Sequence, residues 1–289
     1  MNQGLTSVIV VAADSGPMLR DCVERVLACS APLELIVIDN DSSDGVPEAL
    51  QRALASEVRL KVVYNRANLG FGAAVNRAEE VATGDALLIL NPDCLLEPDT
   101  LSRLRCVLDN HLHAGVVGAV VMDGDGTPDP ASCRRDPLLR RVLATLRRRD
   151  AEEGLYVTPP WPEHVAEAEA ISGALMLMPR RAFRNIEGFD EDYFLHFEDL
   201  DLCRRLRDAH YQVLLAGDVR VHHAKGTSSA HRPVFVSRHK HAGMWRWLRR
   251  YDPALKRPLT ALTVWLGLWA HFLAELPLLM LKRRPRPRS

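Results

Sequence analysis

The sequence predicts an α/β protein with a mostly parallel central sheet and helices on both of its faces. Short aliphatic and β-branched runs alternate with longer helical patterns through the first 120 residues, and polar residues follow the ends of three of these runs. Such alternation is typical of βαβ units, whose strands are parallel. With 47% hydrophobic residues, the 289-residue chain can form one large domain and a smaller addition.

Each predicted element is placed by its own pattern. The expected strands are 7–12, 34–39, 60–64, 86–90 and 116–121. The expected helices are 18–28, 46–54, 72–81 and 100–110. Segment 123–169, rich in Arg, Pro and acidic residues, is expected to be a variable excursion with one helix. A small-residue strand at 171–178 then precedes a short helix that begins at Pro179 and ends before Gly188.

Polar residues follow three strands, in segments 39–45, 65–70 and 91–93. Ordinary turns have a similar composition. Because ligands of open α/β sheets gather at the carboxyl ends of the strands, three such segments at one edge favour a binding site.

The first two acidic candidates lie at this edge. Asp39 can accept a hydrogen bond from a pyrimidine imide N–H, and Asn40 and Asp41 lie beside it to meet a ribose. Asp93 follows an apolar strand, where its carboxylate can bind a divalent cation that bridges diphosphate oxygens. Taken alone, the sequence at 91–93 also fits a plain turn.

The strongest single segment is 188–206, where aromatic residues lead into Glu198, Asp199 and Asp201 at the start of a helix. Acidic residues in a first helical turn are also favoured by the helix dipole. The number of carboxylates exceeds what capping requires, and one of them can serve as general base for an acceptor hydroxyl. Farther on, a short strand carries His222 and His223, and an imidazole there can complete the coordination of a metal such as Mn²⁺.

Taken together, the segments 38–45, 68–76, 90–93, 172–174 and 197–203 resemble glycosyltransferase family 2 enzymes of the GT-A fold, in a bacterial rhamnosyltransferase-like branch. The resemblance spans roughly residues 5–230. It implies an inverting transfer, Mg²⁺ or Mn²⁺ as cofactor, Asp39 at the base, Asp199 as catalytic base, and Asp93 in place of the last acid of the Asp-x-Asp metal motif. It also implies His222 as a metal ligand, with His223 as the open alternative.

The same resemblance extends the candidate site. The expected nucleotide-sugar-binding residues are Asp39, Asn40, Asp41, Asn68, Gly70, Asn76, Asn91 and Asp93. The expected acceptor-site residues are Gly173 and Glu198. Residues 12–15 lack the aromatic residue that the family commonly has after the first strand, which leaves the donor's identity open.

The last 65 residues differ in charge from the rest. Residues 225–289 hold 14 of the 37 Lys and Arg residues but two of the 37 acids, so the body is acidic and the tail basic. Residues 259–281 are mostly apolar, and basic residues flank both ends: Arg246, Arg249, Arg250, Lys256 and Arg257 before, Lys282, Arg283, Arg284, Arg286 and Arg288 after. This favours an interfacial or re-entrant helix on an anionic membrane, with a core-docking or oligomerisation helix as the alternative.

The expected organisation is a GT-A domain at 1–230, with a nucleotide half at about 1–122 and an acceptor half at about 165–230, and a basic, helical, membrane-associating region at 231–289. The expected function is transfer of a sugar, first of all rhamnose, from a dTDP- or UDP-linked donor to a polyprenyl-linked or polysaccharide acceptor. The protein is expected at the cytoplasmic face of the membrane, without nucleic acid and with a homo-oligomer left open. The alternatives are a nucleotidyltransferase and an inactive membrane-bound scaffold; residues 12–17 contain no Lys or Arg to hold a triphosphate, which disfavours the first.

Overall fold

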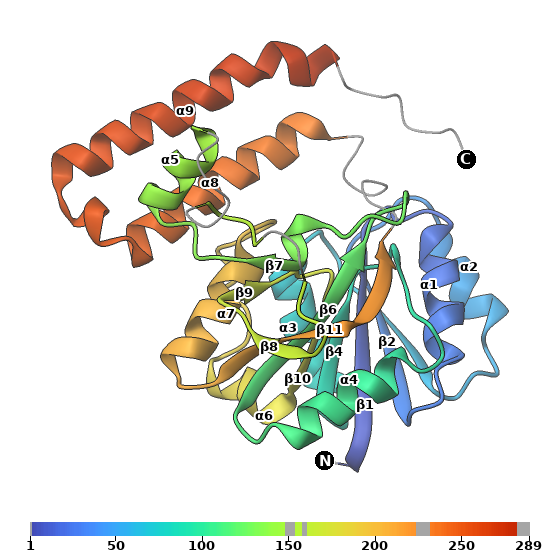
Figure 1. The fold of residues 1–289 in the computed structure, drawn as a ribbon. Helices are drawn as coiled ribbons and strands as arrows, with labels where there is room; N and C mark the ends of the chain where they lie inside the picture. Colours follow the sequence, from blue (N-terminus) through green and yellow to red (C-terminus); the bar gives the residue numbers. More distant parts are fainter. Residues whose placement is uncertain (1, 148–153, 158–160, 224–231, 282–289) are drawn as a thin grey trace.

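A computed structural model describes residues 2–147, 154–157, 161–223 and 232–281 (Figure 1). Its main sheet has the order β3-β2-β1-β4-β10-β6-β11-β5, with β8 paired to β11. These strands are β1 (Asn2–Ala12), β2 (Leu33–Asp39), β3 (Leu60–Tyr64), β4 (Gly84–Leu90), β5 (Cys94–Leu95), β6 (Ala114–Met122), β8 (Val165–Glu167), β10 (Leu175–Pro179) and β11 (Gln212–His223). Strands β1 to β4 pair in parallel, as do β6 and β11, so the predicted mostly parallel α/β fold is confirmed.

Helices cover both faces of this sheet because its strands are apolar on both sides. Val8 and Val10 of β1 face a core that includes α1 and α4, whereas Ile9 and Val11 face a second core that includes α3 and α7. The helices of this body are α1 (Met18–Leu27), α2 (Val46–Ala53), α3 (Phe71–Val81), α4 (Thr100–Asn110), α6 (Arg180–Asn185) and α7 (Glu198–Asp208).

The segment expected as a variable excursion contributes to the sheet structure. It contains the expected helix, α5 (Leu139–Leu146), and also η1 (Pro130–Ser132), β7 (Cys133–Arg134) and β8. Strand β7 pairs with β9 (Ala170–Ile171) in a second, two-stranded sheet. The strand expected at 171–178 is therefore two strands, β9 and β10, because the chain leaves one sheet and enters the other between them.

The tail forms two packed helices, α8 (Pro233–Tyr251) and α9 (Pro258–Leu281), joined by η2 (Pro253–Lys256). They lie beyond the edge at which the strands of the body end (Figure 1). Helix α9 matches the expected apolar helix at 259–281, and by length and composition it could cross a membrane. Apart from Ala261 and Phe272, its side chains are exposed or half-buried.

Two of the arginines that precede this helix in the sequence form ion pairs with the body of the protein. Arg246 pairs with Asp190 at 3.0 Å, and Arg250 pairs with Asp190 at 2.8 Å and with Asp201 at 3.2 Å. They therefore attach α8 to the acidic segment around α7. The basic residues after position 281, the loop at 224–229 and the expected domain border at 230 lie outside the described residues.

Candidate active site

Asp39 lies at the end of β2, where the predicted nucleotide site begins. It is buried, and its Oδ1 accepts a hydrogen bond from the Ser42 backbone N–H at 3.0 Å. Burial raises the pKa of this carboxyl group. Asp41 is exposed and has a left-handed backbone with φ of 66°, which is uncommon for a residue other than glycine. The two aspartates thus offer one buried and one exposed carboxylate at the same edge.

Asn40 lies between them but braces the neighbouring loop. Its Nδ2 donates to Asn68 Oδ1 at 3.0 Å and to the Gly70 carbonyl at 3.1 Å. Its Oδ1 accepts from Asn65 Nδ2 and from the Leu69 N–H, both at 3.0 Å. An amide side chain has two donor hydrogens and two acceptor lone pairs, so this side chain is fully used. The structure therefore favours a positioning role for Asn40 and Asn68 instead of direct contact with a ribose.

Asn76 and Gly70 connect the nucleotide half to the loop that precedes α7. Asn76 Nδ2 donates to the Phe189 carbonyl at 3.0 Å, and its Oδ1 accepts from the Phe189 N–H at 2.9 Å. Gly70 has φ of 87°, and a Cβ there would lie 2.6 Å from the Phe194 carbonyl oxygen. These two predicted donor-site residues therefore hold the loop at 189–194 in place.

Asp93 lies beside His223 at the turn after β4. The Asp93 Oδ1 is 2.9 Å from His223 Nε2, and both side chains are largely buried. Metal ligands at about 2.1 Å and at right angles lie about 3 Å apart, so this pair fits a small octahedral cation. His223 Nδ1 is buried without a hydrogen-bond partner among the described residues. Cys94 is also near, but its buried thiol is 3.4 Å from the Ala174 carbonyl and its pKa is raised by burial, so it is a poor ligand.

The structure places His222 away from this pair. His222 is exposed, whereas the side chain of His223 is largely buried and faces Asp93. The two residues are neighbours in β11, so their side chains point to opposite faces of the strand. Of the two histidines that the sequence left open as metal ligands, the geometry therefore favours His223.

Asp199 lies in the first turn of α7 and contacts three donors. Its Oδ2 accepts from the Gly173 N–H at 2.9 Å and from the Arg134 guanidinium, and its Oδ1 accepts from the Leu200 N–H at 2.8 Å. A Cβ at Gly173 would lie 3.1 Å from Asp199 Cβ and Oδ2, so the absence of a side chain there permits the close approach.

A single short segment connects Asp199 with the turn that carries Asp93. While Gly173 contacts Asp199, the next residue, Ala174, accepts a hydrogen bond from the Asn91 N–H at 2.9 Å. Adjacent residues of this segment thus contact the surroundings of both predicted acids, which lie 106 positions apart in the sequence.

Arg134 is a site residue that the sequence analysis missed. It comes from β7, in the segment expected to be a variable excursion, and it also donates to the Ile171 carbonyl at 3.1 Å. The next residue, Arg135, points elsewhere and donates to the Tyr156 carbonyl at 3.0 Å. No spacing pattern distinguishes the two arginines, so the sequence offers no signal for Arg134.

Glu198 is the more unusual of the two acids. It is buried, its Oε2 has no hydrogen-bond partner among the described residues, and burial together with the nearby Asp199 charge raises its pKa to about 8. Burial lowers the pKa of the neighbouring His196 to about 4. His196 and Phe197 both have left-handed backbones, with φ of 67° and 73°. Strained backbone of this kind is typical of functional sites.

Asp201, the third acid of this segment, supports the helix instead of facing the site. It is fully buried and bonds to Arg205 at 2.6 Å and to the Tyr251 hydroxyl at 2.7 Å. With Arg250 as a further partner, it joins α7 to α8.

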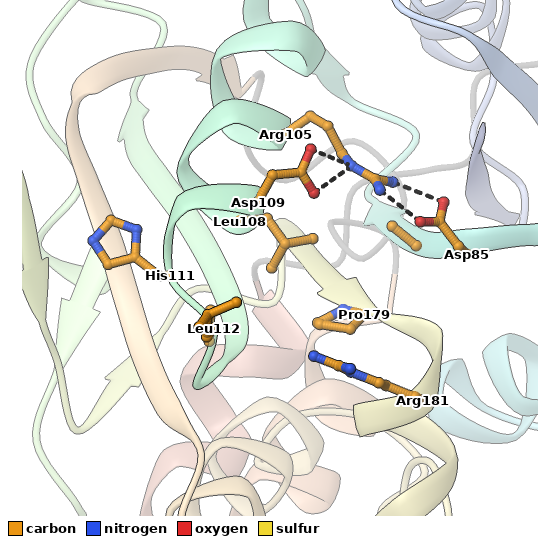
Figure 2. Close-up of a pocket in the computed structure, with 10 residues that line it drawn as sticks. Asp85, Arg105, Leu108, Asp109, His111, Leu112, Pro179 and Arg181 are labelled. Carbon is orange, nitrogen blue, oxygen red and sulfur yellow. Dashed lines mark hydrogen bonds and ion pairs between the residues drawn. The ribbon is translucent and has the colours of Figure 1, made fainter. Parts of the chain in front are cut away.

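A hollow of about 570 Å³ lies at the opposite edge of the sheet (Figure 2). Arg105 lines it and is held between Asp85, at 2.6 Å, and Asp109, at 3.0 Å. Because Asp85 is near the start of β4 and Asp93 follows the end of β4, this hollow is separate from the predicted site.

Comparisons with known proteins identify the family and the fold. Residues 7–161 match the family model described as Glycosyl transferase family 2. The chain is 29% identical over 283 residues to the N-acetylglucosaminyl-diphospho-decaprenol L-rhamnosyltransferase of Mycobacterium tuberculosis, covering 87% of this chain and 91% of that protein. It is 24% identical over 252 residues to the rhamnosyltransferase WbbL of Escherichia coli K12, covering 83% and 88%.

Solved structures share the fold. The mannosyltransferase PcManGT from Pyrobaculum calidifontis, in complex with GDP-Man and Mn²⁺, aligns with a TM-score of 0.60 at 22% identity, covering 96% of this chain and 73% of that chain. Staphylococcus aureus TarS 1–349 in complex with UDP-GlcNAc aligns with a TM-score of 0.57 at 17% identity, covering 93% and 80%. The family match spans more than half of the residues and confirms the predicted enzyme class. The chain belongs to glycosyl transferase family 2 and is a glycosyltransferase of the GT-A fold.

Proposed function

We propose that this protein transfers rhamnose from dTDP-rhamnose to a polyprenyl diphosphate-linked sugar in envelope glycan assembly. Two relatives, each aligned over more than four fifths of the chain, are named rhamnosyltransferases, and one of these names specifies a diphospho-decaprenol acceptor. The observation that carries the proposal is the single segment at 173–174, which contacts both Asp199 and the turn bearing Asp93.

In the proposed reaction, an acceptor hydroxyl oxygen bonds to the anomeric carbon while the bond from that carbon to the diphosphate oxygen breaks. Asp199 takes the hydroxyl proton, and the nucleoside diphosphate leaves from the opposite side, which inverts the anomeric centre. Within the described part of the chain, the Asp199 Oδ1 accepts one hydrogen bond, from Leu200, and therefore keeps a second lone pair for that proton. Gly173 and Arg134 hold the other oxygen and so fix the direction of the carboxylate.

Asp93 and His223 would hold Mg²⁺ or Mn²⁺, since one carboxylate and one imidazole suit an ion whose other ligands are diphosphate oxygens and water. When bound, the ion neutralises the charge that develops on the departing diphosphate. Asp39 would bind the base and Asp41 the ribose, while Asn40, Asn68, Gly70 and Asn76 keep the surrounding loops in position.

The acceptor proposal agrees with the shape of the tail. Helix α9 carries exposed leucines, among them Leu262 at 54%, Leu266 at 53% and Leu273 at 62% exposure. An apolar helix face of this kind binds at the membrane–water interface, where the reactive end of a polyprenyl-linked sugar lies. We place the protein at the cytoplasmic face of the membrane, where nucleotide sugars are available.

The test is transfer from a panel of dTDP-, UDP- and GDP-linked sugars to a polyprenyl diphosphate N-acetylglucosamine acceptor, with Mn²⁺ or Mg²⁺ present. Rhamnose transfer from dTDP-rhamnose should be fastest. Asp199→Asn should lower kcat by about 10²- to 10⁴-fold. Asp208→Asn, on the exposed end of the same helix, is the matched control and should keep the native rate. Full activity of Asp199→Asn would exclude Asp199 as the base. Faster transfer from another donor would exclude rhamnose as the preferred sugar.

A further inference from the structure

Helices α8 and α9 bring together three side chains with metal-binding chemistry, far from the predicted active site in the sequence. His241 comes from α8, and His271 and Glu275 come from α9. One ligand atom from each of them lies within 4.8 Å of the other two. His271 and Glu275 are four residues apart, so they occupy the same face of their helix. We propose that His241, His271 and Glu275 form a Zn²⁺ site that fastens α9 to α8.

The hydrogen bonds of His241 prepare its ring for a metal. The His241 Nδ1 is 2.7 Å from the Ser237 carbonyl oxygen, which can only accept, so Nδ1 carries the hydrogen. In the neutral ring the lone pair is then on Nε2, and this atom is 3.0 Å from His271 Nδ1. A backbone carbonyl that fixes the tautomer and direction of an imidazole is a usual second-layer partner of a metal-binding histidine.

Ser237 of α8, which orients His241, also forms a hydrogen bond with Glu275. The Ser237 hydroxyl donates to Glu275 Oε2 at 3.1 Å, and Glu275 Oε1 is 3.8 Å from His271 Nε2. In a tetrahedral site with bonds of about 2.0 to 2.1 Å, neighbouring ligand atoms lie about 3.3 Å apart. The 3.0 Å between His241 Nε2 and His271 Nδ1 is close to this value. The Glu275 ligand atom lies within 4.8 Å of the histidine ligand atoms, so a rotation of its side chain toward them would complete the site.

The donor set decides which metal is expected. Two imidazoles and one carboxylate suit Zn²⁺, whereas an aspartate beside diphosphate oxygens suits Mg²⁺ or Mn²⁺. The side chains of His271 and Glu275 are 59% and 40% exposed, so an ion can enter and water can take the fourth position. The protein therefore holds two sites of different preference, and this one does not depend on the proposed transferase reaction.

The site has a structural consequence because its ligands come from both helices. A bound ion would resist separation of α9 from α8, and it would keep the packed face of α9, including Ala261 and Phe272, turned toward the protein. The exposed leucines of α9 would then keep their orientation relative to α8. Ion binding would thus set how the apolar face of α9 is presented.

The test is Zn²⁺ binding to the full chain, measured by competition with a chromophoric chelator at pH 7.5. The Asp93→Asn background removes the other candidate site. In this background we expect one equivalent of Zn²⁺ and a higher Tm with Zn²⁺ than with chelator alone. His271→Ala and Glu275→Gln should each weaken binding by at least about tenfold and reduce the Tm shift, because tenfold weaker binding removes about 1.4 kcal/mol of the stabilisation by Zn²⁺.

His113→Ala, which removes an exposed histidine in the body, is the matched control and should bind as the parent does. Circular dichroism distinguishes a lost ligand from a misfolded variant, and Glu275→Gln keeps the size of the side chain. Absence of Zn²⁺ binding by the Asp93→Asn protein would overturn the proposal and show that the contact between the two helices is only hydrogen-bonded. Unchanged stoichiometry and affinity in both ligand variants would overturn it as well.

Discussion

At the scale of single residues, the start of α7 combines two acids with one arginine. Arg134 pairs with Asp199, while Glu198 is buried beside them with one oxygen unpartnered among the described residues. One positive charge offsets one carboxylate, so the second is favoured in its neutral form, in agreement with its pKa of about 8. The charge balance of the site therefore depends on a residue from β7, outside the motif itself.

Removing this arginine should affect both stability and turnover. Arg134→Gln leaves a largely buried carboxylate without its ion-pair partner, which typically costs about 3 kcal/mol of unfolding free energy. We expect urea unfolding to show a loss of this size, and kcat to fall because Asp199 loses one of the groups that direct it. Arg140→Ala, an exposed arginine of the same segment, should change neither quantity. A native kcat in Arg134→Gln would show that the pair does not position the base.

Glu198 should make stability depend on pH in a defined direction. Its pKa is about 8 in the folded protein against an ordinary 4.5, so between these values the folded state holds a proton that the unfolded state releases. The free energy of unfolding therefore falls as pH rises through this window. Glu198→Gln should remove the dependence and be more stable than the native protein at pH 9 by about 1 kcal/mol or more, since one pKa unit corresponds to about 1.4 kcal/mol.

The measurement is urea unfolding of both proteins from pH 6 to pH 9. Glu163→Gln, an exposed glutamate, is the control and should follow the native pH profile. His196 acts in the opposite direction at lower pH: its folded pKa of about 4 is depressed, so its contribution to stability is lost as pH falls from 6.5 toward 4. Equal pH dependence of the native protein and Glu198→Gln between pH 6 and pH 9 would contradict the buried, neutral acid.

At the scale of elements, α8 is part of the site's support. Its Gly243 lies against the left-handed turn before α7: a Cβ there would lie 3.0 Å from the His196 carbonyl oxygen and 3.1 Å from the Phe197 ring. Arg250 and Tyr251, from the end of the same helix, bond to Asp201 of α7. Helix α8 thus holds the strained turn that aims Glu198 and Asp199.

Two glycine-to-alanine substitutions distinguish the effect of this contact from the effect of helix propensity. Alanine in a helix interior is favoured over glycine by about 0.8 to 1.0 kcal/mol. Gly267→Ala in α9 meets no atom within 4 Å and should gain stability of about this size without changing activity. Gly243→Ala should gain no stability and should lower kcat by at least about tenfold, because the turn is displaced. Thermal unfolding and transfer assays measure both, and native activity in Gly243→Ala would separate α8 from the site.

At the scale of the whole molecule, the C-terminal helices form a layer beyond the ends of the strands that carry the candidate site (Figure 1). Helix α9 packs on α8 along one side, and much of its apolar surface is exposed. Transfer of an exposed apolar helix face out of water is strongly favourable in free energy. The protein therefore presents its apolar surface on the side of the molecule where the proposed acceptor would arrive.

Replacing Leu262, Leu266 and Leu273 together with serine should weaken binding to vesicles that contain phosphatidylglycerol. Full burial of each leucine contributes about 1.5 to 3 kcal/mol, so we expect at least about a tenfold loss in vesicle co-sedimentation. Leu112→Ser, in which an 81% exposed leucine of the body is changed, is the control. If the triple variant instead dissociated an oligomer and bound vesicles as before, α9 would be an oligomerisation helix.

The strands and helices of the first 120 residues could be predicted well because their patterns are local. The five expected strands appear as β1, β2, β3, β4 and β6, and the four expected helices appear between them. Successive side chains of these strands point to opposite faces of the sheet, and a core covers each face. Each strand is therefore a continuous apolar run, and polar turns separate the runs. Helix α8 lies in the region expected to be basic and helical, but its attachment to the body could not be predicted, because Arg246 and Arg250 pair with Asp190, which lies far away in the sequence.

Local pattern and motif order were enough to predict the fold class and the family, and to select Asp39, Asp93 and Asp199 as candidates for the site. Which histidine lies beside Asp93 and which arginine pairs with Asp199 depend on contacts between segments that are far apart in the sequence. Strand β11 changes register between Ala216 and Arg220, so counting along the chain does not reveal which side of the strand His223 occupies. Arg134 and Asp199 are 65 positions apart, and only packing of β7 against β9 brings them together.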